Sequence, residues 1–155
     1  MKGNEKIIKR LNILLADELT AIGQYMVHSE MCGNWGYGKL HNAIKARAIG
    51  EMKHAEKLIE RILFLEGSPD VSGMQKVLIG NDVEEQFKND RDAETVANKA
   101  YNDGIRLCYE LGDNGTMELL KSILTEEEKH LDWLETQLSL IKQIGNKNYL
   151  IEQVG

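Results

Sequence analysis

Long stretches without a helix-breaking residue constrain this chain more than any other feature of its sequence. The 155 residues include a single proline, Pro69, and most of the glycines fall into three clusters, at 33–38, 67–80 and 112–115. Glycine and proline are the residues that most often interrupt helices. The clusters therefore divide the chain into four long segments, each predicted to be a helix.

Each segment repeats apolar residues at intervals of three and four, which is the spacing of one helix face. The second segment covers about 39–66, the third about 82–111, and the fourth ends at about 144. Each apolar face also carries one glutamate near the middle of its segment. These glutamates are Glu18, Glu51, Glu94 and Glu127. Their place within apolar faces predicts that they are buried.

The lengths of the connections predict how the helices are arranged. The turns near Trp35 and Asp113 are short, so each is expected to join two antiparallel helices. The connection at 67–81 has 15 residues, and when nearly extended it reaches roughly 50 Å, whereas a 30-residue helix is roughly 45 Å long. It can therefore run back along the whole bundle, which makes the second and third helices parallel. The four glutamates then meet near the middle of an all-α four-helix bundle.

An internal repeat supports this arrangement. A shift of 76 residues carries residues of the first half onto identical residues of the second. The matched pairs are Glu18 and Glu94, Tyr25 and Tyr101, Glu51 and Glu127, His54 and His130, and Leu58 and Leu134. The two hairpins are thus predicted to be pseudo-twofold copies, each supplying one lone glutamate and one Glu-x-x-His pair.

Four carboxylates gathered in an apolar core need a positive partner. Burying even one unpaired charge costs several kcal/mol, and two divalent cations would neutralise four negative charges. The i, i+3 spacing lets the glutamate and histidine of each pair reach one point. Two imidazole nitrogens with several carboxylate oxygens suit iron or manganese better than a structural zinc. The predicted catalytic and metal-binding residues are Glu18, Glu51, His54, Glu94, Glu127 and His130.

Charge and cysteine content argue against other classes of function. The formal net charge is −6 and no run of Lys or Arg is long enough to follow a phosphate backbone, so nucleic acid is not an expected partner. The N-terminal stretch mixes charged with apolar residues, so we expect a cytoplasmic protein without a secretory signal or a membrane partner. Cys32 and Cys108 lack a C-x-x-C spacing and are assigned no chemistry. His28 and His41 are likewise left without a role.

The chain resembles the bacterioferritins over essentially its whole length. The residues that carry the resemblance are EMKH at 51–54, EEKH at 127–130, Glu18 and Glu94. Ferritin-like di-iron bundles are known to use this pattern of ligands. The resemblance implies one ferritin-like domain over 1–155, with the bundle at about 5–144 and a short fifth helix at about 147–153. It also implies a 24-subunit shell that oxidises two Fe(II) per subunit with O2 or H2O2 and stores ferric mineral inside. In that family pattern Glu18 and Glu94 are terminal ligands, Glu51 and Glu127 bridge the metals, and His54 and His130 bind one metal each.

Met52 carries the resemblance to bacterioferritins rather than to other ferritins. It lies one residue from the metal-binding face of its helix and is expected to point outward. The resemblance implies that two such methionines, from subunits related by a twofold axis, bind one haem b iron from both sides. A thioether favours reduced iron, which suits a haem that passes electrons inward, and the family suggests a small ferredoxin as the reductant.

The chain also departs from the pattern of some bacterioferritins. Those relatives have an inner-surface iron site around the second helix, where this chain has Ala46, Arg47 and Gly50, so that site is expected to be absent. Leu58 stands where those relatives have another tyrosine, which excludes a redox role there. Tyr25 and Trp133 lie near the predicted centre, where either a redox role or simple packing is open.

The C-terminal tail is expected to form the short fifth helix after Gly145, which stops the fourth helix. Its apolar residues, from Tyr149 to Ile151, need a partner. The resemblance implies that they pack against symmetry mates at a fourfold axis.

Three other classes of protein stay open at this point. A di-metal enzyme that activates oxygen for an organic substrate would use the same bundle without a mineral-filled shell. A peroxide-scavenging protein of the rubrerythrin type would usually carry paired C-x-x-C motifs, which this chain lacks. A metal-free helical scaffold would leave the four buried glutamates without compensation.

Overall fold

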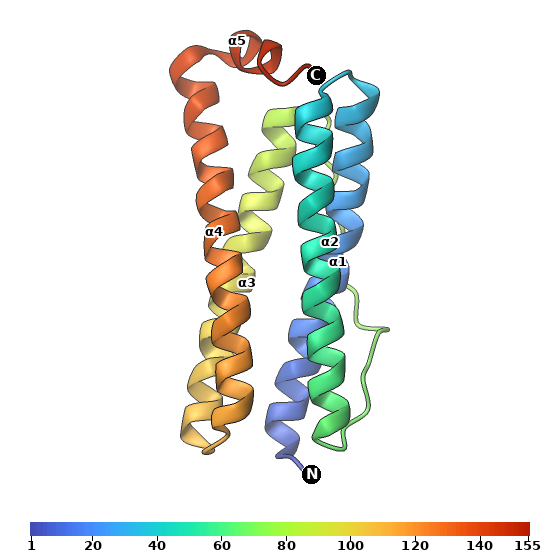
Figure 1. The fold of residues 1–155 in the computed structure, drawn as a ribbon, viewed down its shortest axis with the longest axis vertical. Coiled ribbons are helices and arrows are strands. Elements are labelled where there is room, and N and C mark those ends of the chain that lie inside the picture. The colour runs from blue at the N-terminus through green and yellow to red at the C-terminus, as the bar shows by residue number, and fades with distance from the viewer.

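The computed structural model describes residues 1–155, in which two tight turns and one long connection join the long helices and Gly145 leads into a short last one (Figure 1). The helices are α1 (Glu5–Asn34), α2 (Gly38–Phe64), α3 (Val83–Glu110), α4 (Asn114–Ile144) and α5 (Asn146–Ile151). The prediction of a four-helix bundle with a short fifth helix is confirmed. Helix α5 ends two residues before the predicted position 153, because the chain there tightens into turns in which the Glu152 and Gln153 N–H groups donate to carbonyls three residues back.

The order of the helices in space follows the predicted topology. Helix α1 packs along α2, and α3 packs along α4, each pair antiparallel. The connection at 65–82 runs back along the outside of the bundle, so α2 and α3 point in the same direction (Figure 1). None of the helices has a stretch apolar enough for a membrane span.

The two tight turns repeat each other in detail. Gly36 and Gly112, 76 residues apart, both have positive φ angles, 90° and 73°, a backbone conformation that glycine adopts without steric cost. The N–H of Tyr37 donates to the carbonyl of Cys32, and the N–H of Asp113 donates to the carbonyl of Cys108, both at 2.9 Å. The internal repeat therefore extends from the predicted ligands to the ends of the hairpins.

The apolar core is divided into two clusters along the bundle axis. One includes Leu11, Leu58 and Leu120, and the other includes Ile44, Phe87 and Leu134. The predicted ligands lie along the helices between these clusters. Cys32 and Cys108 are both buried and unpaired, and burial raises the pKa of Cys32 to about 12 and that of Cys108 to about 11. Neither thiol is therefore a ready nucleophile.

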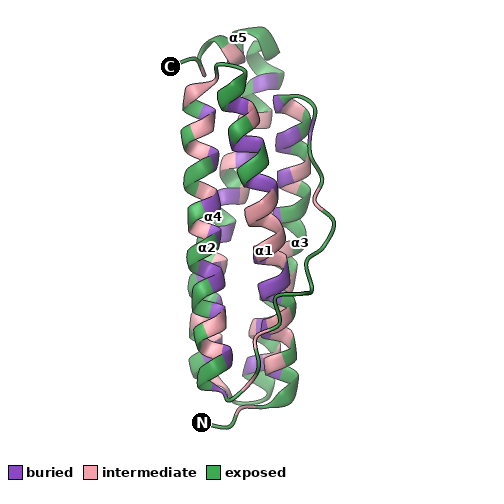
Figure 2. Cartoon of the chain, turned by 90° about the vertical axis from the view of Figure 1, so that its right-hand side faces the viewer, coloured by how far each residue is buried: buried purple, intermediate pink, exposed green.

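A row of polar side chains on α1 holds the long connection in place. Asn12, Thr20, Gln24 and His28 are spaced by multiples of four residues, so they lie on one helix face. They accept hydrogen bonds of 2.8 to 3.1 Å from backbone N–H groups of the connection, at Asp70, Gln75, Leu78 and Gly80 respectively. Figure 2 shows the connection running beside α1, largely exposed to solvent.

The inner end of this row is anchored by a buried carboxylate. Asp90 of α3 accepts a hydrogen bond of 2.7 Å from Gln24 and lies 3.0 Å from Nδ1 of His28. Because Nε2 of His28 accepts from the Gly80 N–H, its Nδ1 carries the proton that points to Asp90. His28, which the sequence pattern left without a role, thus fixes the end of the connection.

Candidate metal centre

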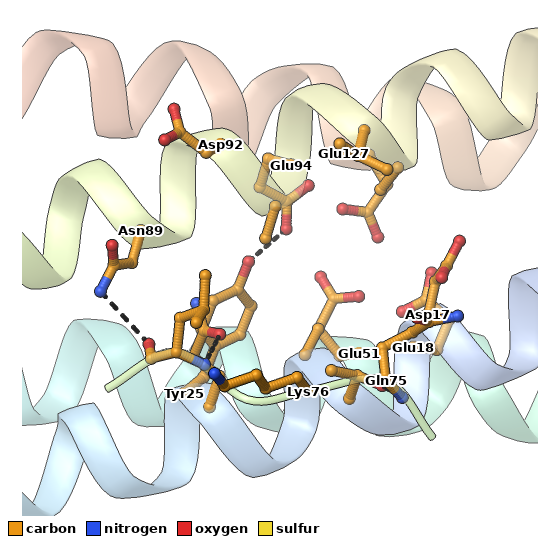
Figure 3. A pocket seen from close by; sticks show the side chains of 17 residues that line it. Asp17, Glu18, Tyr25, Glu51, Gln75, Lys76, Asn89, Asp92, Glu94 and Glu127 are labelled. Carbon is orange, nitrogen blue, oxygen red and sulfur yellow. Dashed lines mark hydrogen bonds between the residues drawn. The ribbon is translucent and has the colours of Figure 1, made fainter. Parts of the chain in front are cut away.

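The six predicted ligands converge in the middle of the bundle. At most 3% of any of these residues is exposed. They form two overlapping groups in which the ligand atoms all lie within 4.8 Å of one another. One group contains Glu18, Glu51, His54 and Glu127, and the other contains Glu51, Glu94, Glu127 and His130. Figure 3 shows the carboxylates of Glu18, Glu51, Glu94 and Glu127 pointing into the space between the helices.

Both histidines turn their Nδ1 atoms toward the carboxylates. Nδ1 of His54 lies 2.9 Å from Glu127, 3.6 Å from Glu51 and 3.7 Å from Glu18. Nδ1 of His130 lies 3.0 Å from Glu94. Each imidazole can therefore offer its Nδ1 lone pair to the group of oxygens beside it.

The carboxylates have more oxygen atoms than hydrogen-bond partners. One oxygen of each of Glu18, Glu51, Glu94 and Glu127 is buried without any partner. Buried polar atoms are nearly always hydrogen-bonded, so four unpartnered oxygens in one small space need cations. The donor set of carboxylate oxygens and imidazole nitrogens fits two ions such as Fe(II).

The pKa shifts of the metal-free centre also indicate that positive charge is missing there. Burial raises the pKa of Glu18 and of Glu94 above their ordinary range. Burial and the neighbouring Glu18 raise the pKa of Glu51 to about 8. Burial alone would lower the pKa of His54, but its hydrogen bonds to three carboxylates together raise it. In the absence of metal, protons therefore supply part of the missing positive charge.

Two tyrosines support the lone glutamates from the opposite hairpin. Tyr101 donates to Glu18 at 2.5 Å, and Tyr25 donates to Glu94. Burial and the nearby carboxylates raise the pKa of both phenols well above the ordinary value, so both stay protonated as donors. Tyr101 was not singled out from the sequence, although the internal repeat pairs it with Tyr25.

Trp133 and Leu58 lie where the sequence placed them near the centre. The Trp133 ring stacks on that of His130, with centroids 6.3 Å apart, and the edge of Tyr25 meets the same imidazole at 5.2 Å. Leu58 is fully buried in the apolar core. Tyr25 and Trp133 both contact His130, which is compatible with a redox role and with simple packing.

Glu126 is a residue of the site that the sequence reasoning missed. Its Oε2 lies 2.5 Å from Nε2 of His54, although 52% of the Glu126 side chain is exposed. The hydrogen bond to His54 lowers the pKa of Glu126, so the carboxylate is ionised at neutral pH. The only signal in the sequence is that Glu126 belongs to a run of three glutamates, at 126–128.

A cavity of about 410 Å³ leads toward the carboxylates between α1 and α3. Glu18, Tyr25, Glu51, Glu94 and Glu127 line its inner part, while Gln75 and Lys76 of the long connection border it (Figure 3). The path of the connection thus sets one wall of the access to the centre.

Met52 lies outside the centre, as predicted, with 46% of the residue exposed. Met26 and Ile49 are also exposed apolar residues of α1 and α2. A second cavity of about 600 Å³ is lined by Met26, Val27, Met31 and Trp35, among others. The α1 and α2 hairpin therefore carries exposed apolar side chains apart from the carboxylates.

Comparison with known proteins relates the chain to one family. The family model of the ferritin-like domain matches residues 8–144. A bacterioferritin of Brucella melitensis is 40% identical over 149 residues, which cover 96% of this chain and 92% of the relative. Bacterioferritins of Rhodobacter capsulatus and Mycobacterium leprae are 40% and 38% identical, over 97% and 96% of this chain and 94% of each relative.

Proposed function

This chain belongs to the bacterioferritins of the ferritin-like family, and from that premise we propose that it stores iron and oxidises Fe(II) at the buried carboxylate centre. The observation that carries the proposal is the set of four buried, unpartnered carboxylate oxygens beside two imidazole nitrogens. Such a set binds divalent iron and remains a good ligand for the harder ferric ion.

Each residue of the centre has a distinct role in this proposal. Glu51 and Glu127 belong to both ligand groups, so they bridge the two iron ions, whereas Glu18 and Glu94 each bind one ion as terminal ligands. His54 and His130 each supply one neutral nitrogen. Tyr101 and Tyr25 hold the terminal carboxylates in place through their hydroxyl groups.

Iron is the substrate of the reaction, and O2 or H2O2 is the oxidant. Two Fe(II) give up one electron each, and the pair of electrons with two protons from solvent converts O2 to H2O2, or H2O2 to two waters. The residues bind both ions at once, so that the two electrons are available together. The cavity between α1 and α3 provides a route from solvent to the carboxylates.

Haem binding at a twofold dimer interface is a further part of the proposal. Met52 is exposed, as are Met26 and Ile49 of the same hairpin, so one chain offers an exposed thioether and a second copy would complete the site. An exposed thioether with apolar side chains on the same hairpin has the chemistry to bind a haem b. When bound, the haem would supply an electron-transfer group, with a ferredoxin as the reductant.

The proposed assembly is a shell of 24 copies, each a single domain over residues 1–155. Tyr149 of α5 is buried and donates to Gln137 of α4 at 2.6 Å, whereas Ile151 is exposed. Helix α5 is therefore docked on its own chain and still presents an apolar side chain to a neighbour, in line with packing at a fourfold axis.

The ferroxidase role is tested by the double variant Glu94→Ala, Glu127→Ala. Rapid Fe(II) oxidation should be lost while particle size by light scattering stays that of the shell. The matched control is Glu110→Ala, Glu128→Ala, which changes exposed glutamates of the same two helices and should keep the wild-type rate. A full oxidation rate in the first variant would count against the proposal.

The haem is tested separately by reconstitution and the Soret absorption band. Met52→Ala should abolish or strongly shift this band, whereas Met74→Ala, which alters an exposed methionine of the long connection, should not. An unchanged Soret band in Met52→Ala would overturn the haem assignment without affecting that of the iron centre.

A further inference from the structure

The two halves of the metal centre have the same ligands but different outer partners. The shift of 76 residues that relates the ligands also relates position 126 to position 50. Position 126 is the glutamate that contacts His54, while position 50 is a glycine. Gly50 is the counterpart of Glu126 in the repeat and has no side chain that could contact an imidazole, so only His54 has a carboxylate at its Nε2.

Glu126 determines which nitrogen of His54 carries the proton. Its carboxylate lies 2.5 Å from Nε2, while Nδ1 faces the ligand carboxylates. A carboxylate oxygen accepts a hydrogen bond, so Nε2 keeps its proton and Nδ1, which faces the other carboxylates, is the nitrogen left to bind a metal. A carboxylate hydrogen-bonded to a ligating histidine also fixes the ring and makes the ligand more basic.

His130 has no equivalent support. Its Nε2 makes no hydrogen bond within the chain, and its only polar contact is that of Nδ1 with Glu94. Trp133 and Tyr25 restrict the position of the ring by packing, but neither fixes its tautomer. A Cβ atom at Gly50 would meet no other atom within 4 Å, so the space at this position is open.

We propose that Glu126 is a positioning residue that makes the two metal positions unequal. The position formed by Glu18, Glu51, His54 and Glu127 fills first and retains its ion, and the position formed with Glu94 and His130 fills second and exchanges its ion more readily. This inference rests on the proposed two-metal centre and adds an order of filling to it.

The position of Arg47 is consistent with this role. Its guanidinium group donates to the backbone carbonyl of Glu126 at 3.4 Å, which ties α2 to α4 beside the His54 contact. Arg47 thus helps to hold the backbone of Glu126 in place beside His54.

The test is a titration of the metal-free, full-length protein with Co²⁺. Calorimetry measures the affinity of each step, and the visible d–d absorption of bound cobalt reports the surroundings of each ion. The wild type should bind two ions per chain in two steps of different affinity. Glu126→Ala should weaken the first step by about 10–100-fold and change the first cobalt spectrum. Glu126→Gln retains a hydrogen-bond acceptor, so it should restore most of the affinity and the spectrum.

The matched control is Glu128→Ala, the same substitution on an exposed side chain two residues away, which should leave both steps unchanged. The reciprocal variant Gly50→Glu supplies the missing carboxylate at the counterpart of position 126. It should raise the affinity of the second step and bring the two steps together.

The outcomes separate this inference from the proposed function. If the wild type binds no Co²⁺ in the centre, the two-metal proposal itself is wrong. If two ions bind but Glu126→Ala leaves the affinity and spectrum of the first step unchanged, the centre stands and the role of Glu126 is overturned. A weakened first step in Glu126→Ala, with an unchanged second step and most of the affinity restored in Glu126→Gln, would support the positioning role.

Discussion

The two hairpins of this bundle are alike where they face each other and different where they face outward. Ligands, supporting tyrosines and tight turns all recur after 76 residues. Glu126, by contrast, has only Gly50 as its counterpart. The comparison teaches that a repeated set of ligands does not by itself give two equivalent metal positions, because the groups behind the ligands also set their properties.

A second difference concerns the long connection. Thr20, Gln24 and His28 of α1 accept its backbone hydrogen bonds, whereas the corresponding positions of α3 are Val96, Ala100 and Gly104. Only the first hairpin therefore carries a polar row. The connection is held against α1 at the side of the access cavity, which makes the two sides of the bundle unequal in a way that the ligands do not reveal.

The largest expected effect tests whether the bridging glutamates are equivalent. Glu51→Ala and Glu127→Ala each remove a carboxylate shared by both metal positions. Each should lower the initial rate of Fe(II) oxidation by more than about 100-fold, since loss of an outer partner alone costs about 10–100-fold. Stopped-flow absorbance measures the rate, with Glu56→Ala as the control on the exposed face of α2. A large loss in only one bridging variant would break the equivalence.

The next effect is on stability and depends on pH in the metal-free protein. Burial and neighbouring Glu18 raise the pKa of Glu51 to about 8, and the pKa values of Glu18, Glu94 and His54 are also raised. The folded state therefore binds more protons than the unfolded chain, so its stability falls as the pH rises from about 5 to 9. Burial lowers the pKa of His130, so the contribution of this residue to stability rises with pH and offsets part of the fall.

Thermal unfolding across this pH range measures the effect, which should amount to several kcal/mol. Protein saturated with Co²⁺ is the control, because metal ions replace the protons and the fall should be much smaller. An unfolding temperature of the metal-free protein that rises between pH 5 and 9 would contradict the assigned electrostatics.

A smaller effect distinguishes the two histidines. His54→Ala and His130→Ala each remove one nitrogen ligand, but only the first removes one supported by Glu126. Calorimetric titration should therefore show that His54→Ala weakens the tighter Co²⁺ step by about tenfold more than His130→Ala does. Equal effects on the same step would mean that the outer carboxylate does not influence affinity.

The smallest effect concerns the polar row on α1. Thr20→Ala removes the acceptor of the Gln75 N–H and should lower the local stability of the connection by about 1 kcal/mol. Hydrogen exchange of the Gln75 amide reports this change. Val96→Ala, at the corresponding position of α3, is the control and should leave that amide unaffected.

The sequence predicted the features that depend on spacing within one helix. Glu51 and His54 are three residues apart on an apolar face, and a second copy at Glu127 and His130 strengthens the pattern. The length of the connection fixed the topology, which brings the six residues to one layer. Residue spacing within a helix and the length of a connection can both be read from one sequence, so these features could be predicted.

Other features depend on distances between helices and could not be predicted. Three successive glutamates follow Thr125, and only the packing of α4 on α2 shows that Glu126 reaches His54. His28 is a lone histidine on a helix, and its partners Gly80 and Asp90 lie more than 50 residues away. Tyr101 was marked by the repeat, but its hydrogen bond to Glu18 of the opposite hairpin required the structure.

The measurement that tests the central claim most directly is an anaerobic Fe(II) titration of the metal-free protein, followed by exposure to oxygen. Absorbance of the ferric product and particle size are recorded together. We predict a fast phase that saturates at two iron ions per chain in a large shell. No saturable fast phase would contradict the two-metal centre, and a two-iron phase in a small oligomer would contradict the storage shell and favour an oxygen-activating enzyme.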